Sequence, residues 1–320
     1  MNKILEELSL IGIVPVVSID DACDAVPLAK ALTDGGLPCA EITFRTAAAR
    51  DAIKAITDAY PEMIVGAGTV LTPSQADEAT EAGAKFIVSP GFNPDVVKHC
   101  IDKGYPIVPG INNPSGVEQA ISLGLEAVKF FPAEASGGLP MIKAMSAPYG
   151  SMKFMPTGGI NLSNVNDYLG FKKIFACGGS WMVKPEMIKA HDFDGIRKLT
   201  EEAVDKMLGY GIWHVGMNME KSEETDEVAD TLLRAFGFEP DKYEKATFAG
   251  GLFEIMRFGG RGKHGHIGIK THSIERAMYR LKKKGFEFDM STAAYDDDGN
   301  IKIVYMKGEI GGFAFHLTRA

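Results

Sequence analysis

Residues 126–138 read EAVKFFPAEASGG, a short apolar run that Pro132 brings to an end. Side chains of a β-strand alternate between its two faces, so Lys129 is expected to point to one side and Val128 and Phe130 to the other. A lysine in such a strand commonly extends its ammonium group to water. The sequence on both sides of this segment indicates whether Lys129 does so or takes part in chemistry.

Apolar runs followed by helical segments recur on both sides of residues 126–138. Eight such runs lie in the first 210 residues, at 12–19, 38–44, 63–68, 85–89, 105–110, 127–131, 153–158 and 173–178. The segment 20–36 opens with aspartates and ends at glycines, as helices do. Continuous apolar runs are typical of parallel strands buried on both faces. We therefore expect an α/β fold, a (β/α)8 TIM barrel over residues 1–210. The alternative is an open doubly wound sheet. That fold commonly carries a G-x-G-x-x-G motif after its first strand, and this sequence has none there.

Length and composition favour a two-domain globular protein. The chain has 320 residues, an apolar fraction of 45% and a charged fraction of 24%, and its apolar runs are too short to span a bilayer. The first ten residues lack an export signal, and the cysteines have no metal-ligand spacing. The net charge of −8 supplies no basic surface for nucleic acid. We expect a cytoplasmic protein with neither a membrane nor a nucleic-acid partner.

Reactive residues and glycines follow several of the predicted strands, at the ends where barrel enzymes place their chemistry. They are Glu41, Arg45, Lys129 and the glycine-rich loops at 157–159 and 178–180. Each has a simple structural explanation on its own, such as a salt bridge between Glu41 and Arg45. Together they indicate one site, because glycine loops bind phosphate through backbone N–H groups and an amine can attack a carbonyl. Glu41 can then move protons and Arg45 can hold a carboxylate.

The order and spacing of several segments resemble one enzyme family over about residues 5–208. The segments are AEITFRT, VGAGTVLTP, FIVSPGF, VPGI, VKFFPAEASGG, FMPTGGI and CGGSW, and the family is the 2-keto-3-deoxy-6-phosphogluconate (KDPG) and 4-hydroxy-2-oxoglutarate (KHG) aldolases. The resemblance implies a class I aldolase that cleaves KDPG, a phosphorylated keto acid, to pyruvate and glyceraldehyde 3-phosphate. It implies no cofactor and a trimer of barrels. KHG and 2-keto-3-deoxy-6-phosphogalactonate remain alternative substrates.

The same resemblance implies a role for each matching residue. Lys129 corresponds to the Schiff-base lysine and Glu41 to the general acid/base, with Phe131 packed near the imine. The remaining matches are Arg45, Thr69 and Pro90 for the pyruvyl carboxylate, and Gly158, Gly159, Gly179 and Ser180 for the phosphate. One departure is Asn112-Asn113-Pro114, where many relatives carry small hydroxyl residues. This loop therefore bears on the choice of substrate.

The character of the sequence changes after residue 210, where five of the seven histidines lie. Two similar stretches occur there, WHVGMN at 213–218 and GHIGIK at 265–270. A helical segment follows each of them, at 222–236 and 273–284, and strand-like segments follow each helix. We expect a smaller α+β domain over residues 211–320 that consists of two βαβββ units.

The duplicated unit resembles the glyoxalase/bleomycin-resistance, or vicinal oxygen chelate, superfamily over residues 211–319. The positions that match its metal ligands are His214, Glu254, His266 and His316, a set suited to Zn²⁺, Fe²⁺, Mn²⁺ or Ni²⁺. Many relatives have no metal, and histidines on strands are often packed core residues. The sequence therefore favours a metal-free binding or oligomer-supporting domain, with a divalent metal as the alternative.

Two other functions remain open at this point. A phosphosugar isomerase or epimerase on the same barrel would share the glycine loops, but it would not need the amine of Lys129. The barrel can also be a scaffold for the second domain, which would then be a metal-dependent lyase or dioxygenase, or a ligand sensor.

Overall fold

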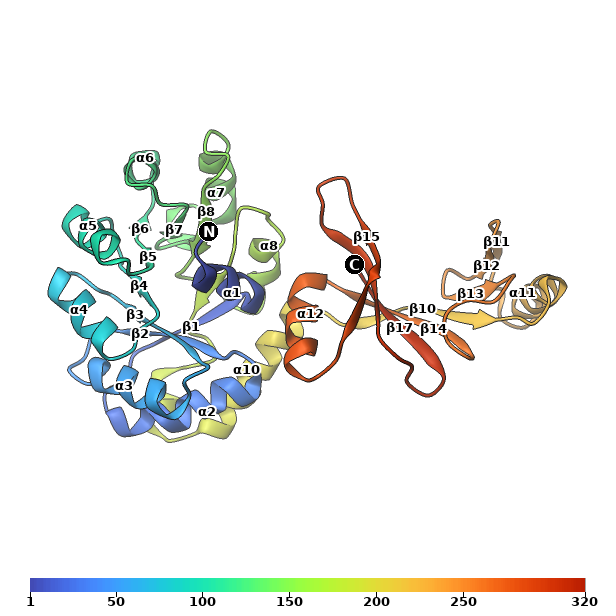
Figure 1. The fold of residues 1–320 in the computed structure, drawn as a ribbon, viewed down its shortest axis with the longest axis horizontal. Coiled ribbons are helices and arrows are strands. Elements are labelled where there is room, and N and C mark those ends of the chain that lie inside the picture. Colours follow the sequence, from blue (N-terminus) through green and yellow to red (C-terminus); the bar gives the residue numbers. More distant parts are fainter. Residues whose placement is uncertain (320) are drawn as a thin grey trace. The chain divides into compact units, whose positions relative to one another are not determined.

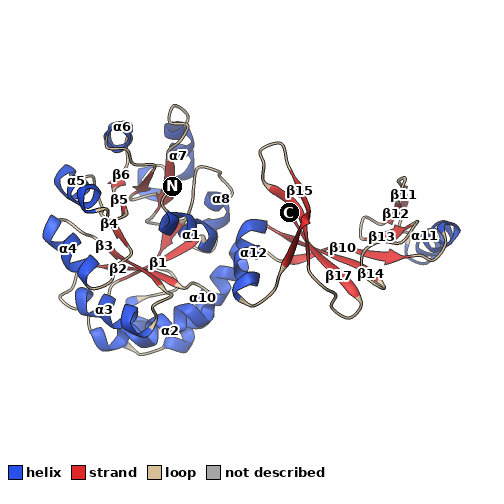
Figure 2. Cartoon of the chain, viewed as in Figure 1, coloured by secondary structure: helices blue, strands red, loops and turns tan. Residues whose placement is uncertain are grey.

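The computed structural model describes residues 1–319 (Figures 1 and 2). The chain divides into two compact units, Met1–Met207 and a second that begins at Leu208. In the described part of the chain, no helix is both long and apolar enough to cross a membrane.

The first unit alternates parallel strands with helices (Figure 1). Its strands are β1 (Ile13–Val17), β2 (Cys39–Thr43), β3 (Ile64–Gly68), β4 (Phe86–Val88), β5 (Ile107–Val108), β6 (Gly110–Ile111), β7 (Ala127–Phe130), β8 (Lys153–Pro156) and β9 (Cys177–Gly179). One sheet has the order β5-β4-β3-β2-β1-β9 and another the order β6-β7-β8. Pro109 separates β5 from β6, and the bridges Phe154–Ile174 and Thr157–Gly178 connect the β8 and β9 segments. The strands therefore follow one another around a closed circle, which confirms a TIM-barrel-like α/β unit.

Helices lie outside these strands in Figure 2. They are α1 (Lys3–Ile11), α2 (Ala25–Gly35), α3 (Ala49–Ala59), α4 (Pro73–Glu81), α5 (Pro94–Lys103), α6 (Pro114–Ser122), α7 (Gly138–Ser146), α8 (Val165–Leu169), α9 (Pro185–Lys189) and α10 (Phe193–Leu208), with short 3₁₀ turns at Ala22–Asp24 and Glu134–Ser136. The predicted helix 20–36 begins later than expected, because the side chain of Asp21 caps the 3₁₀ turn that precedes α2. The amino-terminal helix α1 was not predicted.

The strands of the barrel are buried as the continuous apolar runs predicted. Every residue of β2 and β3 is buried. Only two charged side chains of the strands lie inside this apolar environment, Glu41 on β2 and Lys129 on β7, with 1% and 5% of their surface exposed. A charge is costly to bury without a partner, so these two side chains are candidates for a functional role.

The second unit is built on one mixed eight-stranded sheet. Its elements are β10 (Gly211–Asn218), α11 (Ser222–Phe236), β11 (Pro240–Lys242), β12 (Ala246–Ala249), β13 (Phe253–Met256), β14 (Gly265–Thr271), α12 (Ile274–Lys283), β15 (Phe288–Tyr295), β16 (Ile301–Met306) and β17 (Phe313–Arg319). The strand order is β11-β12-β13-β10-β14-β17-β16-β15. The pairs β10–β13 and β14–β17 are parallel, and the other pairs are antiparallel.

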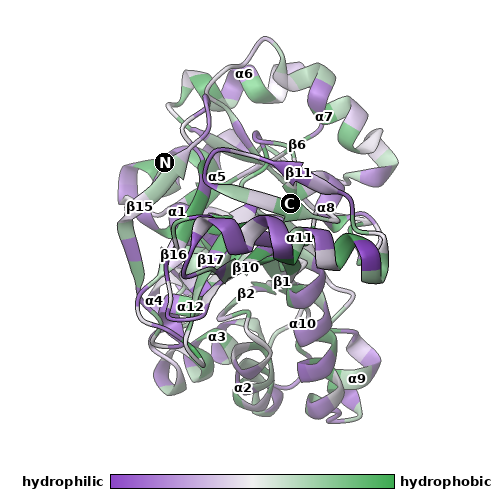
Figure 3. Cartoon of the chain, turned by 90° about the vertical axis from the view of Figure 1, so that its right-hand side faces the viewer, coloured by the Kyte–Doolittle hydropathy of each residue, from purple (hydrophilic) through white to green (hydrophobic). Residues whose placement is uncertain are grey.

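A small apolar core holds α11 to the sheet. Ala229 of α11 packs in one cluster with Ala249 of β12 and Ile255 of β13. Hydrophilic and hydrophobic residues alternate along α11 in Figure 3, as expected for a helix with one face on a sheet. Since side chains alternate along β13, Glu254 points to the face opposite this core.

Candidate functional site

Lys129 and Glu41 meet inside the barrel. Nζ of Lys129 donates a hydrogen bond to Oε1 of Glu41 over 3.1 Å, and both side chains are buried. The ring centroid of Phe131 lies 5.3 Å from the same Nζ. The structure therefore brings together the amine, the carboxylate and the aromatic ring that the sequence singled out.

Strand register and one glycine place this pair. Lys129 is paired with Gly110 on one side and Met155 on the other, and Glu41 is paired with Gly66. A Cβ at Gly68 would lie 2.2 Å from Oε1 of Glu41, so the carboxylate needs a glycine there. Glu41 pairs with Lys129, and the simple alternative of a salt bridge to Arg45 is therefore wrong.

Two of the buried side-chain oxygens of the barrel unit have no hydrogen-bond partner among residues 1–319. They are Oε2 of Glu41 and Oγ1 of Thr157. Buried polar atoms normally have partners, so both are available to a substrate. Thr157 received no role from the sequence. Its position at the end of β8, directly before Gly158-Gly159, was the feature that could have identified it.

The three residues expected to hold a carboxylate follow three neighbouring strands. Arg45 follows β2, Thr69 follows β3 and Pro90 follows β4. Nε of Arg45 donates a hydrogen bond of 3.3 Å to Oγ1 of Thr69. Thr69 has a left-handed backbone with φ 56°, which is uncommon for a residue other than glycine and occurs often at functional sites. The carbonyl of Pro90 packs closely against Gly110, the residue paired with Lys129.

The two glycine-rich loops lie side by side. The bridge between Thr157 and Gly178 places Gly158 next to Gly179, with Ser180 exposed beside them. Gly158 and Gly159 have φ values of 99° and 85°, which residues with a side chain rarely adopt. Such glycine backbones can turn their N–H groups toward an anion.

A second cluster lies in the second unit, where four strands each contribute one side chain. Nε2 of His214 lies 3.0 Å from Nε2 of His266 and 3.2 Å from Nε2 of His316. Oε2 of Glu254 lies 2.9 Å from Nε2 of His266 and 3.3 Å from Nε2 of His214. The four residues that the sequence named as alternative metal ligands are therefore neighbours, and the three histidines are buried.

The electrostatics of this cluster favour neutral imidazoles at His214 and His316 beside an ionised carboxylate at Glu254. Burial and the neighbouring histidines His214 and His266 lower the pKa of His316 to about 4. Burial, followed by His266, also lowers the pKa of His214. Burial alone would raise the pKa of Glu254, but its hydrogen bond to His266 and the nearby imidazoles lower it overall. These are the protonation states in which such groups bind a metal.

Two glycines leave room for the imidazole rings. A Cβ at Gly216 would lie 2.2 Å from the ring of His266, and one at Gly268 would lie 2.9 Å from the ring of His316. Each glycine follows a cluster histidine by two positions, in the repeated pattern His214-Val-Gly216 and His266-Ile-Gly268. The Nδ1 atoms of the three histidines have no partner in the described part of the chain, so packing sets the ring orientations.

Comparisons with known proteins concern the first unit. A family model described as KDPG and KHG aldolase matches residues 4–199. The chain is 50% identical over 204 residues to the 2-dehydro-3-deoxy-phosphogluconate aldolase of Haemophilus influenzae, covering 64% of this chain and 96% of that protein. It is 46% identical over 193 residues to the KHG/KDPG aldolase of Escherichia coli K12, covering 60% of this chain and 91% of that protein.

A solved structure is similar over the same length of chain. It is the KDPG aldolase of Legionella pneumophila, in which pyruvate was captured as a covalent carbinolamine intermediate. The TM-score is 0.60 and the sequence identity 37%, and the match covers 62% of this chain and 97% of that one.

Proposed function

The chain belongs to the KDPG and KHG aldolase family, and we propose that Lys129 and Glu41 carry out the chemistry of its barrel unit. Its reaction is the class I, Schiff-base cleavage of KDPG to pyruvate and glyceraldehyde 3-phosphate. Close relatives are also named for KHG, and we extend the proposal to KHG as a second substrate of this chain. The single observation that carries the residue assignment is the buried contact between Nζ of Lys129 and Oε1 of Glu41.

The hydrogen bond between Lys129 and Glu41 supports the following sequence of proton transfers. Glu41 accepts a proton from the ammonium of Lys129 across 3.1 Å, which leaves a neutral amine. The amine attacks the C2 carbonyl of the substrate to form a carbinolamine. The protonated Glu41 returns its proton to the carbinolamine hydroxyl, which leaves as water and gives the protonated imine. Glu41 then takes the proton of the C4 hydroxyl. The C3–C4 bond breaks, its electrons enter the imine to give an enamine, and the aldehyde leaves. Glu41 returns this proton to C3 of the enamine, which restores the imine, and hydrolysis of the imine then releases pyruvate and the free amine of Lys129.

The remaining barrel residues bind the two ends of the substrate. Arg45 supplies a guanidinium for the pyruvyl carboxylate, with Thr69 and Pro90 beside it. The loops that carry Gly158, Gly159, Gly179 and Ser180 supply backbone N–H groups for the phosphate. Reduction of a mixture of protein and pyruvate with borohydride tests the proposal, because a Schiff base at Lys129 becomes a permanent secondary amine.

The second unit supports a second candidate function, that of a metal-binding domain. A metal bound tetrahedrally at about 2.0 Å separates its ligand atoms by about 3.3 Å, and four of the six atom pairs of the cluster have separations close to this, 2.9 to 3.3 Å. His214, Glu254, His266 and His316 would hold the ion, as Zn²⁺, Fe²⁺, Mn²⁺ or Ni²⁺. Such an ion acts as a Lewis acid toward a bound oxygen ligand. Metal analysis of the purified protein tests this candidate.

We also propose that residues 1–210 and 211–320 are separate domains. In this proposal the second domain is a pair of βαβββ units of the vicinal oxygen chelate type. The element order β10-α11-β11-β12-β13 recurs as β14-α12-β15-β16-β17, and this recurrence supports the pairing.

For the barrel we propose the trimer that the family resemblance implies, and light scattering of the purified protein tests it.

A further inference from the structure

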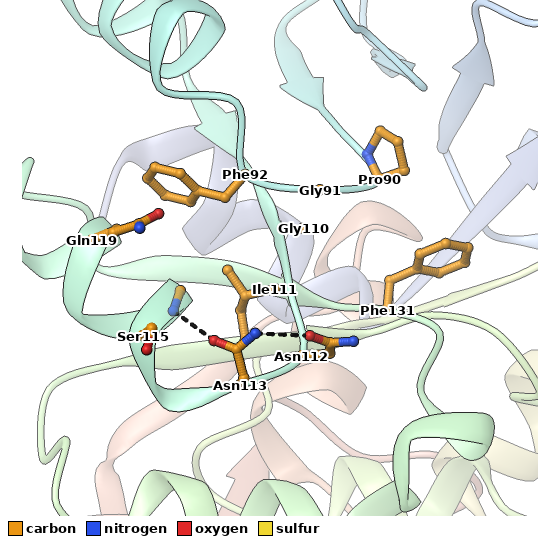
Figure 4. A pocket seen from close by; sticks show the side chains of 11 residues that line it. Pro90, Gly91, Phe92, Gly110, Ile111, Asn112, Asn113, Ser115, Gln119 and Phe131 are labelled. Atoms are coloured by element: carbon orange, nitrogen blue, oxygen red, sulfur yellow. Dashed lines mark hydrogen bonds between the residues drawn. The ribbon is translucent and has the colours of Figure 1, made fainter.

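A groove opens beside Phe131 at the mouth of the barrel (Figure 4). Its volume is about 330 Å³, and it runs between the loop that follows β4 and the loop that follows β6. Pro90 and Phe131 line it together with Phe92, Asn112 and Gln119. All of the residues that line the groove are uncharged, and three of them are amides, so the groove suits a neutral hydroxylated chain more than a second anion.

Hydrogen bonds fix which atom of Asn112 faces the groove. Oδ1 of Asn113 accepts the backbone N–H of Gly116 over 3.0 Å, as the cap of α6. The Nδ2 group of Asn113 therefore turns the other way and donates to Oδ1 of Asn112 over 3.1 Å (Figure 4). This leaves Nδ2 of Asn112 directed away from the pair, and within residues 1–319 it has no protein partner. The backbone N–H of Gly116 thus sets the orientation of both amides, and Asn112 presents its Nδ2 donor to the groove.

Strand register places Asn112 one layer above the reacting amine. Gly110 is paired with Lys129 and Ile111 with Phe130. The hydrogen bond from N of Phe131 to O of Ile111, 3.1 Å long, continues this register, so Asn112 stands beside Phe131. Nζ of Lys129 is 5.3 Å from the ring of Phe131. An imine at Lys129 would therefore hold the substrate next to Phe131, at the level of Asn112.

We propose that Asn112 is a specificity-determining residue, which donates a hydrogen bond from Nδ2 to the hydroxyl oxygen on the carbon next to the aldehyde carbon of the cleaved product. In KDPG this is the C5 hydroxyl, and in free glyceraldehyde 3-phosphate it is the C2 hydroxyl. Asn113 acts as a positioning residue, since it fixes the orientation of the amide of Asn112. The inference rests on the proposed aldol chemistry at Lys129.

The test compares two aldehydes in the addition to pyruvate. Glyceraldehyde 3-phosphate carries the hydroxyl, and 3-phosphonooxypropanal is the same molecule without it. Asn112→Leu removes the donor at similar side-chain size. We expect it to lower kcat/KM for glyceraldehyde 3-phosphate by about 2- to 10-fold, the usual effect of one neutral hydrogen bond, with no comparable loss for the deoxy aldehyde.

A second variant tests whether the preference for the hydroxylated aldehyde comes from the hydrogen-bond donor or only from a side chain that fills the groove. Asn113→Asp keeps a cap for the N–H of Gly116 but has no N–H to donate, so the amide of Asn112 turns its Nδ2 toward the new carboxylate. The groove then faces an acceptor instead of a donor. We expect the preference for the hydroxylated aldehyde to fall while the melting temperature stays unchanged. Ser115→Asp adds the same charge to the groove without touching the amide pair, and it should keep the preference.

The outcomes separate this inference from the aldolase assignment. Each variant is also reduced with borohydride in the presence of pyruvate. If the wild-type protein is not modified, the chemistry at Lys129 is wrong. If all variants are modified normally but Asn112→Leu lowers kcat/KM equally for both aldehydes, or for neither, the role of Asn112 is overturned. A loss of preference in Ser115→Asp as large as that in Asn113→Asp would also overturn it, because charge alone would then explain the effect.

Discussion

Nζ of Lys129 and Oε1 of Glu41 are 3.1 Å apart inside the barrel, although 88 positions separate the two residues in the chain. Each is the closest charged partner of the other, and both are shielded from water. Transfer of one proton along this hydrogen bond converts an ion pair into a neutral amine and a neutral acid. The same contact therefore makes burial of the two groups tolerable, and in the proposed mechanism it prepares Lys129 as the nucleophile.

Glu41→Gln tests the carboxylate of this pair. Glutamine keeps the size of the side chain but cannot take the proton of the C4 hydroxyl, so kcat should fall by about 10²- to 10⁴-fold. Imine formation with pyruvate should persist at a reduced rate. Steady-state kinetics and borohydride reduction measure the two effects separately. A change in KM alone would make Glu41 a binding residue.

Gly68→Ala tests the geometry of the pair without replacing either reactive residue. The added methyl group would lie 2.2 Å from Oε1 of Glu41 and must displace it from Lys129. We expect a fall in kcat as in Glu41→Gln, with destabilisation of about 1–3 kcal/mol from overpacking. Gly150→Ala is the matched control, because a Cβ there meets no atom within 4 Å. Full activity in a folded Gly68→Ala protein would show that the contact is dispensable.

Ser180→Asp tests the proposed phosphate site at the two glycine-rich loops. A carboxylate beside Gly158 and Gly179 repels phosphate in a site whose other donors are backbone N–H groups. The variant should lose most of the preference for KDPG over its unphosphorylated analogue, while pyruvate still forms an imine. The measurement is the ratio of kcat/KM for the two substrates. An unchanged ratio would place the phosphate elsewhere.

The proposed metal site is tested by elemental analysis of protein purified without added metal. We expect about one divalent ion per chain, as one tetrahedral site requires, and its loss in His266→Ala and His316→Ala. His264→Ala, an exposed histidine outside the cluster, is the control. Cleavage of KDPG should survive treatment with a chelator, because no step at Lys129 uses the ion. Metal-free wild-type protein would favour the metal-free domain that the sequence suggested.

Much of the barrel was predictable because buried parallel strands read as apolar runs. The eight predicted runs correspond to β1–β9, and the rule that chemistry follows strand ends identified Lys129 and Glu41 as candidates. The break at Pro109, which splits the fifth strand into β5 and β6, was not predicted. A proline removes one backbone donor, but whether the strand continues past it depends on its neighbours in the closed barrel.

The partners of the site residues were less accessible to sequence reasoning. The choice of Lys129 over Arg45 as the partner of Glu41 depends on closure of the barrel, which brings β2 and β7 face to face across the interior. The free oxygen of Thr157 became apparent only once burial was known. In the second unit, residues 214 and 316 are 102 positions apart, and only the resemblance to a duplicated unit suggested that they meet.

Covalent trapping tests the central claim most directly. Wild-type protein is incubated with pyruvate, reduced with borohydride, digested and analysed by mass spectrometry, with Lys129→Ala as the control. We expect one added reduced pyruvyl group on the peptide that contains Lys129, complete loss of KDPG cleavage after reduction, and no modification or cleavage in folded Lys129→Ala. Wild-type protein that stays unmodified and active, or a Lys129→Ala variant that retains turnover, would contradict this claim.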